Sequence, residues 1–188
     1  MRQTSFAEFH CSLARSLDVV GDWWAPLIIR DIALGLTRFD QLAEDLGISR
    51  NLLATRLDDL EANGILERRQ YLERPPRYGY RLTRAGVELL PILMSLTAWG
   101  DRWFTPPGGP PVQFQHRTCG HLFTTVESCS ECGAPVKAAD VIPRPGPGIM
   151  AARGARGTKL VPDRIRSLQA ASGTSRSRTD ADQIDDVP

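Results

Sequence analysis

The chain has 188 residues, of which 41% are apolar and 24% are charged, and its formal net charge is +1. This length suits one domain with a good core and a smaller appendage or tail. A net charge near zero excludes a uniformly basic coat for nucleic acid, so any affinity for DNA depends on local clusters. No apolar run approaches the roughly 20 residues that span a bilayer, and the N-terminus lacks the apolar core of a signal peptide. We therefore expect a cytoplasmic protein with no membrane partner.

Apolar residues at helical spacing, separated by short turns, predict three helices in the first part of the chain. The first two cover residues 13–20 and 23–34. Thr37 offers an N-cap for the third helix, with Asp40 completing an approximate capping box. Gly47 is expected to end the third helix in the left-handed conformation, which glycine adopts without steric strain.

A fourth helix is expected to follow this glycine turn and to enter DNA. Leu53, Leu57 and Leu60 stand at positions i, i+4 and i+7 and form its inward face. Its open face carries the polar residues expected to contact DNA: Ser49, Arg50, Asn51 and Thr55. Such a helix end fits a major groove about 12 Å wide, where Arg reads guanine and Asn reads adenine. We therefore expect Arg50 and Asn51 to contact base edges.

A basic β-hairpin and a last helix follow. Residues 66–72 and 78–82 are predicted strands, joined by Glu73-Arg74-Pro75-Pro76-Arg77. The arginines of this region are Arg68, Arg69, Arg74, Arg77, Arg81 and Arg84. A basic hairpin can hold the DNA backbone beside an inserted helix, so we expect Arg74 and Arg77 to contact phosphate. Thr83 is expected to cap a last helix that ends near residue 103 and is kinked at Pro91.

Residues 11–103 resemble the HxlR-type family of bacterial winged helix-turn-helix regulators. The matching stretches are residues 11–24, 37–42, 52–66 and 74–83, the last of which, Arg-Pro-Pro-Arg-Tyr-Gly-Tyr-Arg-Leu-Thr, is the most specific. The resemblance implies a homodimer formed through the terminal helices, a palindromic operator and an effect on transcription. The apolar stripe expected at the dimer interface is Leu90, Leu93, Met94 and Trp99. The resemblance also implies that Arg38 lies near the DNA backbone.

Cys11 has two interpretations. The resemblance places it where some relatives sense electrophiles or oxidants, and a cysteine at a helix start gains thiolate character from the helix dipole. A small cysteine packed in the dimer interface is the alternative. Cys11 is therefore a possible redox sensor.

The remainder of the chain divides into three segments. Residues 105–111 are a Pro/Gly linker, because clustered Pro and Gly cannot continue a helix. Residues 112–143 hold three cysteines and few apolar residues. Residues 144–188 are a predicted disordered tail, since their isolated apolar residues bury too little area to offset chain entropy.

Two matching motifs in residues 112–143 predict a zinc-ribbon-like module. His116-x-x-Cys119-Gly120 and Cys129-x-x-Cys132-Gly133 each place two ligands before a glycine. Structural zinc takes four N or S ligands in a tetrahedron, so we expect His116, Cys119, Cys129 and Cys132 to bind one zinc. Three alternatives remain: turns without metal, a Cys129–Cys132 disulfide, or His121 in place of His116. Four ligands leave no open coordination position, which argues against catalysis.

The predicted fold is mainly α with a small β-hairpin: a winged helix-turn-helix domain (residues 1–104), a zinc-ribbon-like module and a disordered tail. The predicted function is sequence-specific regulation of transcription by a homodimer on double-stranded DNA. The alternative is a protein-interaction adaptor that uses the zinc ribbon and lacks specific DNA binding. No nucleophile–base pair, phosphate loop or carboxylate pair stands out, so we expect no enzymatic activity.

Overall fold

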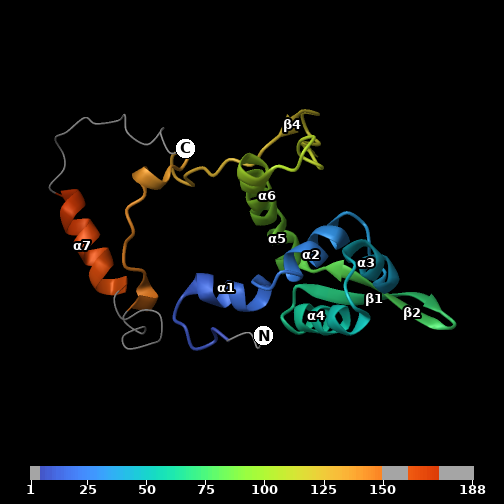
Figure 1. The fold of residues 1–188 in the computed structure, drawn as a ribbon. Coiled ribbons are helices and arrows are strands. Elements are labelled where there is room, and N and C mark those ends of the chain that lie inside the picture. The colour runs from blue at the N-terminus through green and yellow to red at the C-terminus, as the bar shows by residue number, and fades with distance from the viewer. Residues whose placement is uncertain (1–4, 150–160, 174–188) are drawn as a thin grey trace. The chain divides into compact units, whose positions relative to one another are not determined.

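The computed structural model describes residues 5–149 and 161–173 (Figure 1). It divides into two units, Ser16–Ser128 and a second formed by Met1–Arg15 with Cys129–Pro188, and each is described by itself. Up to residue 104 the elements are α1 (Ser12–Val20), α2 (Ala25–Ala33), α3 (Phe39–Leu46), α4 (Arg50–Ala62), β1 (Leu66–Glu73), β2 (Pro76–Leu82), α5 (Arg84–Glu88) and α6 (Leu90–Phe104).

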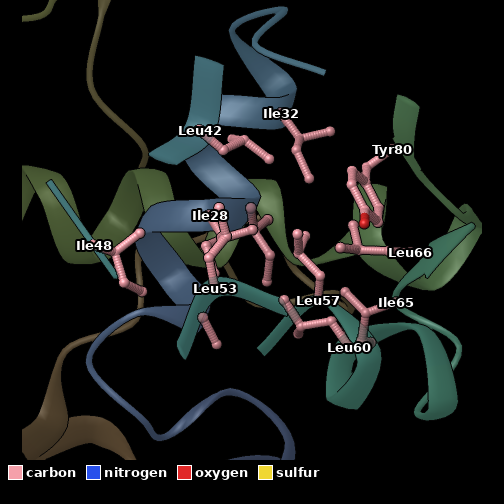
Figure 2. Close-up of a cluster of buried hydrophobic side chains, with 12 residues drawn as sticks. Ile28, Ile32, Leu42, Ile48, Leu53, Leu57, Leu60, Ile65, Leu66 and Tyr80 are labelled. Carbon is pink, nitrogen blue, oxygen red and sulfur yellow. The ribbon is translucent and has the colours of Figure 1, made fainter. Parts of the chain in front are cut away.

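One apolar core holds α2, α3, α4 and the root of the β1–β2 hairpin together (Figure 2). The buried apolar residues are Ala25, Ile28, Ile29, Ile32, Leu42, Ile48, Leu53, Leu57, Leu60, Ile65, Leu66 and Tyr80. Complete burial of one Leu or Ile side chain contributes about 1.5–3 kcal/mol. The inward face predicted for the fourth helix is confirmed, because Leu53, Leu57 and Leu60 are at most 1% exposed.

The turn between α3 and α4 follows the sequence prediction. Gly47 ends α3 with φ 60°, in the left-handed region. The Ser49 Oγ accepts a hydrogen bond from the backbone N–H of Leu52 at 3.4 Å and caps α4. This turn holds α3 and α4 in a helix-turn-helix arrangement.

The N-cap predicted for α3 is wrong by one residue. α3 begins at Phe39 after Arg38, whose backbone N–H donates to Gln41 Oε1 at 3.1 Å. Thr37 is unavailable as the cap because its carbonyl accepts from the Tyr80 N–H at 2.8 Å. An isolated bridge between Arg38 and Gly79 continues this pairing. The start of α3 is therefore set by β2, which lies far along the chain.

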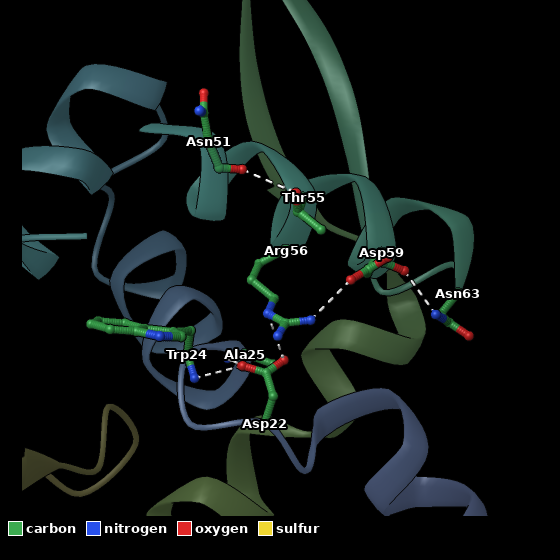
Figure 3. Close-up of polar contacts among 8 residues, drawn as sticks. All are labelled: Asp22, Trp24, Ala25, Asn51, Thr55, Arg56, Asp59 and Asn63. Atoms are coloured by element: carbon green, nitrogen blue, oxygen red, sulfur yellow. Dashed lines mark hydrogen bonds and ion pairs between the residues drawn. The ribbon is translucent and has the colours of Figure 1, made fainter. Parts of the chain in front are cut away.

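Asp22 caps α2 and joins it to α4, a role that the sequence prediction missed. One carboxylate oxygen, Oδ1, accepts from the backbone N–H groups of Trp24 at 2.7 Å and Ala25 at 3.1 Å. The other, Oδ2, lies 3.6 Å from Arg56 Nε (Figure 3). Arg56 also pairs with Asp59 at 3.2 Å. The two helices are thus connected at their polar edge as well as through the core.

The antiparallel β1–β2 hairpin is longer than predicted. Its pairing runs from Leu66 opposite Leu82 to Glu73 opposite Pro76, so the tip is shorter than the expected loop. Only its root is buried, and every residue from Arg68 to Tyr78 is exposed. The hairpin therefore projects from the core as a wing (Figure 1).

The predicted last helix is two helices rather than one kinked helix. Its expected cap is confirmed, since Thr83 Oγ1 accepts from the Gly86 N–H at 3.3 Å. Leu89 ends α5 and precedes α6, and Pro91 stands in the first turn of α6. Proline lacks an N–H and is tolerated in a first turn, where that N–H has no partner.

The segment after the Pro/Gly linker lies against α6. It contains β3 (Phe114–Gln115) and β4 (Leu122–Phe123), which pair antiparallel. The hydroxyls of Ser95 and Thr125 are hydrogen bonded at 2.9 Å. Met94 and Ala98 line a depression together with Phe114 and Phe123. The linker thus leads the chain back along the helix that it follows.

The described part of the tail differs from the prediction of disorder. Besides the short turns η1 (Ala138–Asp140) and η2 (Pro147–Ile149), the second unit contains α7 (Val161–Gly173). An ion pair between Asp163 and Arg166, three residues apart, supports this helix. The predicted disorder of residues 150–160 and 174–188 lies outside the described residues.

Candidate DNA-binding surface

The first turns of α4 present a polar, exposed face. Asn51 and Thr55 are exposed, one turn apart, and the Thr55 hydroxyl donates to the Asn51 carbonyl at 3.0 Å. Figure 3 shows Asn51 directed away from the side of α4 on which Arg56 meets Asp22. One side of α4 is therefore committed to packing, and the other leaves an amide and a hydroxyl oxygen open to a ligand.

Arg50 begins α4 and is held by residues at the start of α3. Its Nη1 lies 2.8 Å from Asp40 Oδ1, and its guanidinium lies 4.8 Å from the centroid of the Phe39 ring. The two charged side chains are 69% and 82% exposed. An exposed pair of this kind contributes about 0–1 kcal/mol, so Arg50 can exchange Asp40 for a DNA group at small cost.

The six arginines of the hairpin region divide into paired and unpaired groups. Arg68 reaches from β1 to α4, where it pairs with Asp58 and, at 2.8 Å, with Glu61. Arg69 pairs with Glu67 at 3.0 Å, and Arg84 with Glu88 at 2.9 Å. Of these six arginines, Arg74, Arg77 and Arg81 form no ion pair with any described residue. Arg74 and Arg77 therefore place unpaired positive charge at the tip of the wing.

Arg68 also borders a buried phenol at the root of the wing. Its guanidinium lies 5.8 Å from the centroid of the Tyr80 ring. Burial raises the pKa of Tyr80 above its usual value, and the nearby Arg68 charge opposes that shift. Tyr80 therefore stays neutral at physiological pH, and Arg68 serves to hold the wing on α4.

Arg38 connects the start of α3 to the middle of the wing. Its side chain is exposed, and its guanidinium lies 5.0 Å from the centroid of the Tyr71 ring on β1. It shares a shallow depression with Thr37, Arg69 and Gly79. Most of the predicted DNA-contacting residues therefore lie on three neighbouring features, the start of α3, the start of α4 and the wing.

The four predicted metal ligands form two short knuckles, one in each unit. In the first, His116 Nδ1 lies 3.4 Å from Cys119 Sγ. In the second, the backbone N–H groups of Cys132 and Glu131 donate to Cys129, which lowers the pKa of that thiol. Among the residues that the structure describes, no three His, Cys, Asp or Glu side chains are grouped closely enough to hold a metal ion. The zinc site stays a prediction.

Cys11 is half-buried and directly precedes α1, where its carbonyl accepts from the Arg15 N–H at 3.1 Å. Its role in redox sensing stays a prediction.

The helix-turn-helix, its exposed polar helix start and the basic wing define a winged helix-turn-helix DNA-binding protein. Residues 19–107 match the model of the HxlR-like helix-turn-helix family. An uncharacterised HTH-type transcriptional regulator of Mycobacterium tuberculosis, Rv3095, is 41% identical over 140 residues, which cover 74% of this chain and 89% of the relative. The chain belongs to the HxlR-like family and is a transcriptional regulator.

Further relatives agree with this assignment. The HTH-type regulator sll1512 of Synechocystis is 36% identical over 94 residues, covering 50% of this chain and 70% of the relative. The crystal structure of PA1607, described as a candidate transcription factor, has a TM-score of 0.67 at 34% identity and covers 77% of this chain and 99% of that one. PA1374 of Pseudomonas aeruginosa has a TM-score of 0.51 at 38% identity, with coverages of 73% and 93%.

The similarity to Rv3095 extends beyond the winged helix. The family model ends at residue 107. The match covers 74% of the 188 residues, so fewer than 50 residues lie outside it. Wherever the match begins in the chain, it therefore includes residues 50–139. The segment with the two knuckles is therefore part of the shared region.

None of the helices in the described part of the chain has the length and apolar character needed to cross a membrane.

Proposed function

We propose that the chain works as a cytoplasmic, non-enzymatic homodimer that binds a palindromic operator. In this proposal α4 enters the major groove, where Arg50 and Asn51 contact base edges and Ser49 and Thr55 contact the neighbouring backbone. Arg74 and Arg77 of the wing, together with Arg38, contact phosphate.

The division of the wing arginines carries this proposal. Ion pairs neutralise Arg68 at the root of the wing, whereas Arg74 and Arg77 near the tip have none within the described residues. An arginine that already pairs with a carboxylate must give up that pair to bind phosphate, which costs free energy. An arginine without an ion pair can bind phosphate directly. In a chain with a net charge of only +1, the unpaired arginines of the wing thus supply local positive charge for phosphate contacts.

One face of α6 supports the homodimer. Leu90 and Leu93, which sequence analysis assigned to the interface, pack instead against the core of their own domain. Leu96, Trp99 and Trp103 stand at i, i+3 and i+7 and are 54–58% exposed. We assign this stripe to a second copy of the chain, because one apolar helix face can pair with itself around a two-fold axis. Such symmetry also places two copies of α4 on two half-sites about one helical turn apart.

Two arginine variants with the same loss of charge test the DNA contacts. Genomic fragments retained by the purified protein supply the probe, and affinity is measured across a salt series. We expect Arg77→Ala to weaken all fragments similarly and to lower the salt slope by about 1. Arg84→Ala is the matched control, because Arg84 begins α5 outside the hairpin and is not among the proposed DNA contacts, and it should leave the slope unchanged. Equal losses of affinity in both variants would contradict the contact between the wing and phosphate. If the wild type showed no salt-dependent DNA binding, the result would favour the alternative function, a protein-interaction adaptor.

Base readout is tested on the same fragments with substitutions at each position. We expect Arg50→Ala to cost about 1–3 kcal/mol and to relax the preference at one base pair in each half-site. An unchanged preference at every position would show that α4 does not read bases through Arg50.

Sedimentation tests the dimer. The wild type should sediment as a dimer at micromolar concentration and Trp99→Glu as a monomer. Val87→Glu, which adds the same charge at a 51% exposed site on α5, is the control and should stay dimeric. A monomeric wild type would overturn the interface.

A further inference from the structure

We propose that His116, Cys119, Cys129 and Cys132 are the ligands of one structural zinc ion. The site lies outside the DNA-binding surface, and neither the family match nor the names of the relatives assign it. The proposal does not depend on operator binding.

The two knuckles have the same backbone hydrogen bonds, although they lie in different units. In the first, the N–H of Gly120 donates to the His116 carbonyl at 2.8 Å, and the N–H of His116 donates to the His121 carbonyl at 2.9 Å. In the second, the N–H of Gly133 donates to the Cys129 carbonyl at 2.8 Å, and the N–H of Cys129 donates to the Ala134 carbonyl at 2.8 Å. The donors and acceptors of these hydrogen bonds thus occupy equivalent positions within each of the two motifs.

The backbone conformation of Gly120 and Gly133 explains why each motif has a glycine after its second ligand. Gly120 has φ 73° and Gly133 has φ 72°, both in the left-handed region. The left-handed turn lets the chain fold back immediately after the second ligand of each pair. Equal sequence spacing has therefore produced the same turn in both motifs, with two candidate ligands before each glycine.

The side-chain atoms of the first knuckle already have the separation that zinc needs. Zinc bonds of about 2.3 Å to sulfur and 2.0–2.1 Å to nitrogen, at the tetrahedral angle, place the two ligand atoms about 3.6 Å apart. His116 Nδ1 and Cys119 Sγ are 3.4 Å apart. This distance favours Nδ1 of His116 as the nitrogen ligand.

The second knuckle adds two thiols, those of Cys129 and Cys132, to the His116 nitrogen and the Cys119 thiol of the first. With three cysteines and one histidine, the ligand set is that of a structural rather than a catalytic zinc site.

Apart from its contacts with α6, the segment buries little apolar area. Of the described residues from 105 to 148, none is buried. Leu122 and Val126, two of its apolar residues, are 60% and 69% exposed. Small modules with so little buried apolar area gain their folding free energy from metal binding. Zinc is therefore the source of stability that the ribbon requires.

Metal content of the full-length protein, purified under reducing conditions without a metal-affinity tag, tests the site. We expect one zinc per chain by elemental analysis, and Co²⁺ in its place should give the absorption bands of tetrahedral thiolate coordination. A zinc content near zero would overturn the proposal. So would intact protein lighter by two hydrogens and free of zinc, since that mass indicates a Cys129–Cys132 disulfide.

Paired variants test the ligand set. Cys132→Ser should abolish the cobalt spectrum, whereas Cys11→Ser should retain it in full. His116→Ala should lose the metal or bind it much more weakly, whereas His121→Ala should retain it. Loss in His121→Ala with retention in His116→Ala would overturn the nitrogen assignment. Because a ligand variant can fail to fold locally, each is also checked for an unchanged melt of the winged helix.

Discussion

The winged helix and the segment that follows it obtain their order in different ways. Every buried apolar residue of the described chain lies between Ala25 and Tyr80, and none lies between residues 105 and 148. The first region is held by apolar contact among α2, α3, α4 and the hairpin root. The second consists of short turns closed by backbone hydrogen bonds. A region without a core needs another source of free energy, and cysteines at ligand spacing occur in that region.

Substituting one core leucine tests the contrast most strongly. Leu57→Ala should lower the free energy of unfolding by about 2–5 kcal/mol, because it leaves a cavity at a fully buried site. Chemical denaturation measures the change. The control is Val126→Ala, at a 69% exposed position of the second region, which should change stability by less than about 0.5 kcal/mol. Similar losses in both variants would show that the second region also has a packed core.

Close packing at Gly86 gives a second test in the winged helix. A Cβ built there lies 2.4 Å from the Ile65 carbonyl oxygen, so backbone must move. Gly86→Ala should cost about 1–3 kcal/mol in a thermal melt, as overpacked sites do. Gly100→Ala is the control, since nothing lies within 4 Å of a Cβ there. A neutral Gly86→Ala would mean that α5 packs less tightly against the Ile65 backbone.

The polar edge between α2 and α4 is expected to contribute less. Asp22→Ala removes the cap of α2 and one partner of Arg56, and should cost about 1–2 kcal/mol. Asp59→Ala removes the other partner of Arg56 without touching a cap, and should cost less than about 1 kcal/mol. If the two variants lose equal stability, the capping role assigned to Asp22 is wrong.

Asp31 should give the smallest effect, and one that depends on pH. It is 1% exposed, pairs with Arg30 at 2.7 Å, and has one carboxylate oxygen, Oδ2, without a hydrogen-bond partner. Burial raises the pKa of this carboxyl above 3.8, with Arg30 opposing the shift. The folded protein therefore binds the proton more tightly than the unfolded chain, and stability falls as pH rises from about 3.8 through the folded pKa.

Asp31→Asn should gain stability relative to the wild type over that interval, as urea titrations at several pH values would measure. A difference that is constant with pH would mean that the pKa of Asp31 is the same in both states.

Features that depend on near neighbours in the sequence were predicted correctly. The inward face of α4 follows from leucines one or two turns apart, and three helix ends follow from the chemistry of Gly47, Ser49 and Thr83. Helix periodicity and capping involve residues within about four positions, so a local pattern is sufficient. The break before Pro91 was predicted only as a kink, because whether a helix bends or restarts depends on what packs around it.

The sequence by itself therefore determined the helix-turn-helix, the wing and the spacing of the proposed zinc ligands, since each is encoded in a short stretch. Only the tertiary structure decided which arginines are free. Arg68 and Arg77 look equivalent in the sequence, yet Arg68 meets Asp58, ten residues away on another element, and Arg77 meets no carboxylate in the described chain. The same holds for Thr37, whose carbonyl is taken by Tyr80. Ion pairs and backbone bonds between distant elements depend on how the core orients those elements, and local patterns carry no record of that orientation.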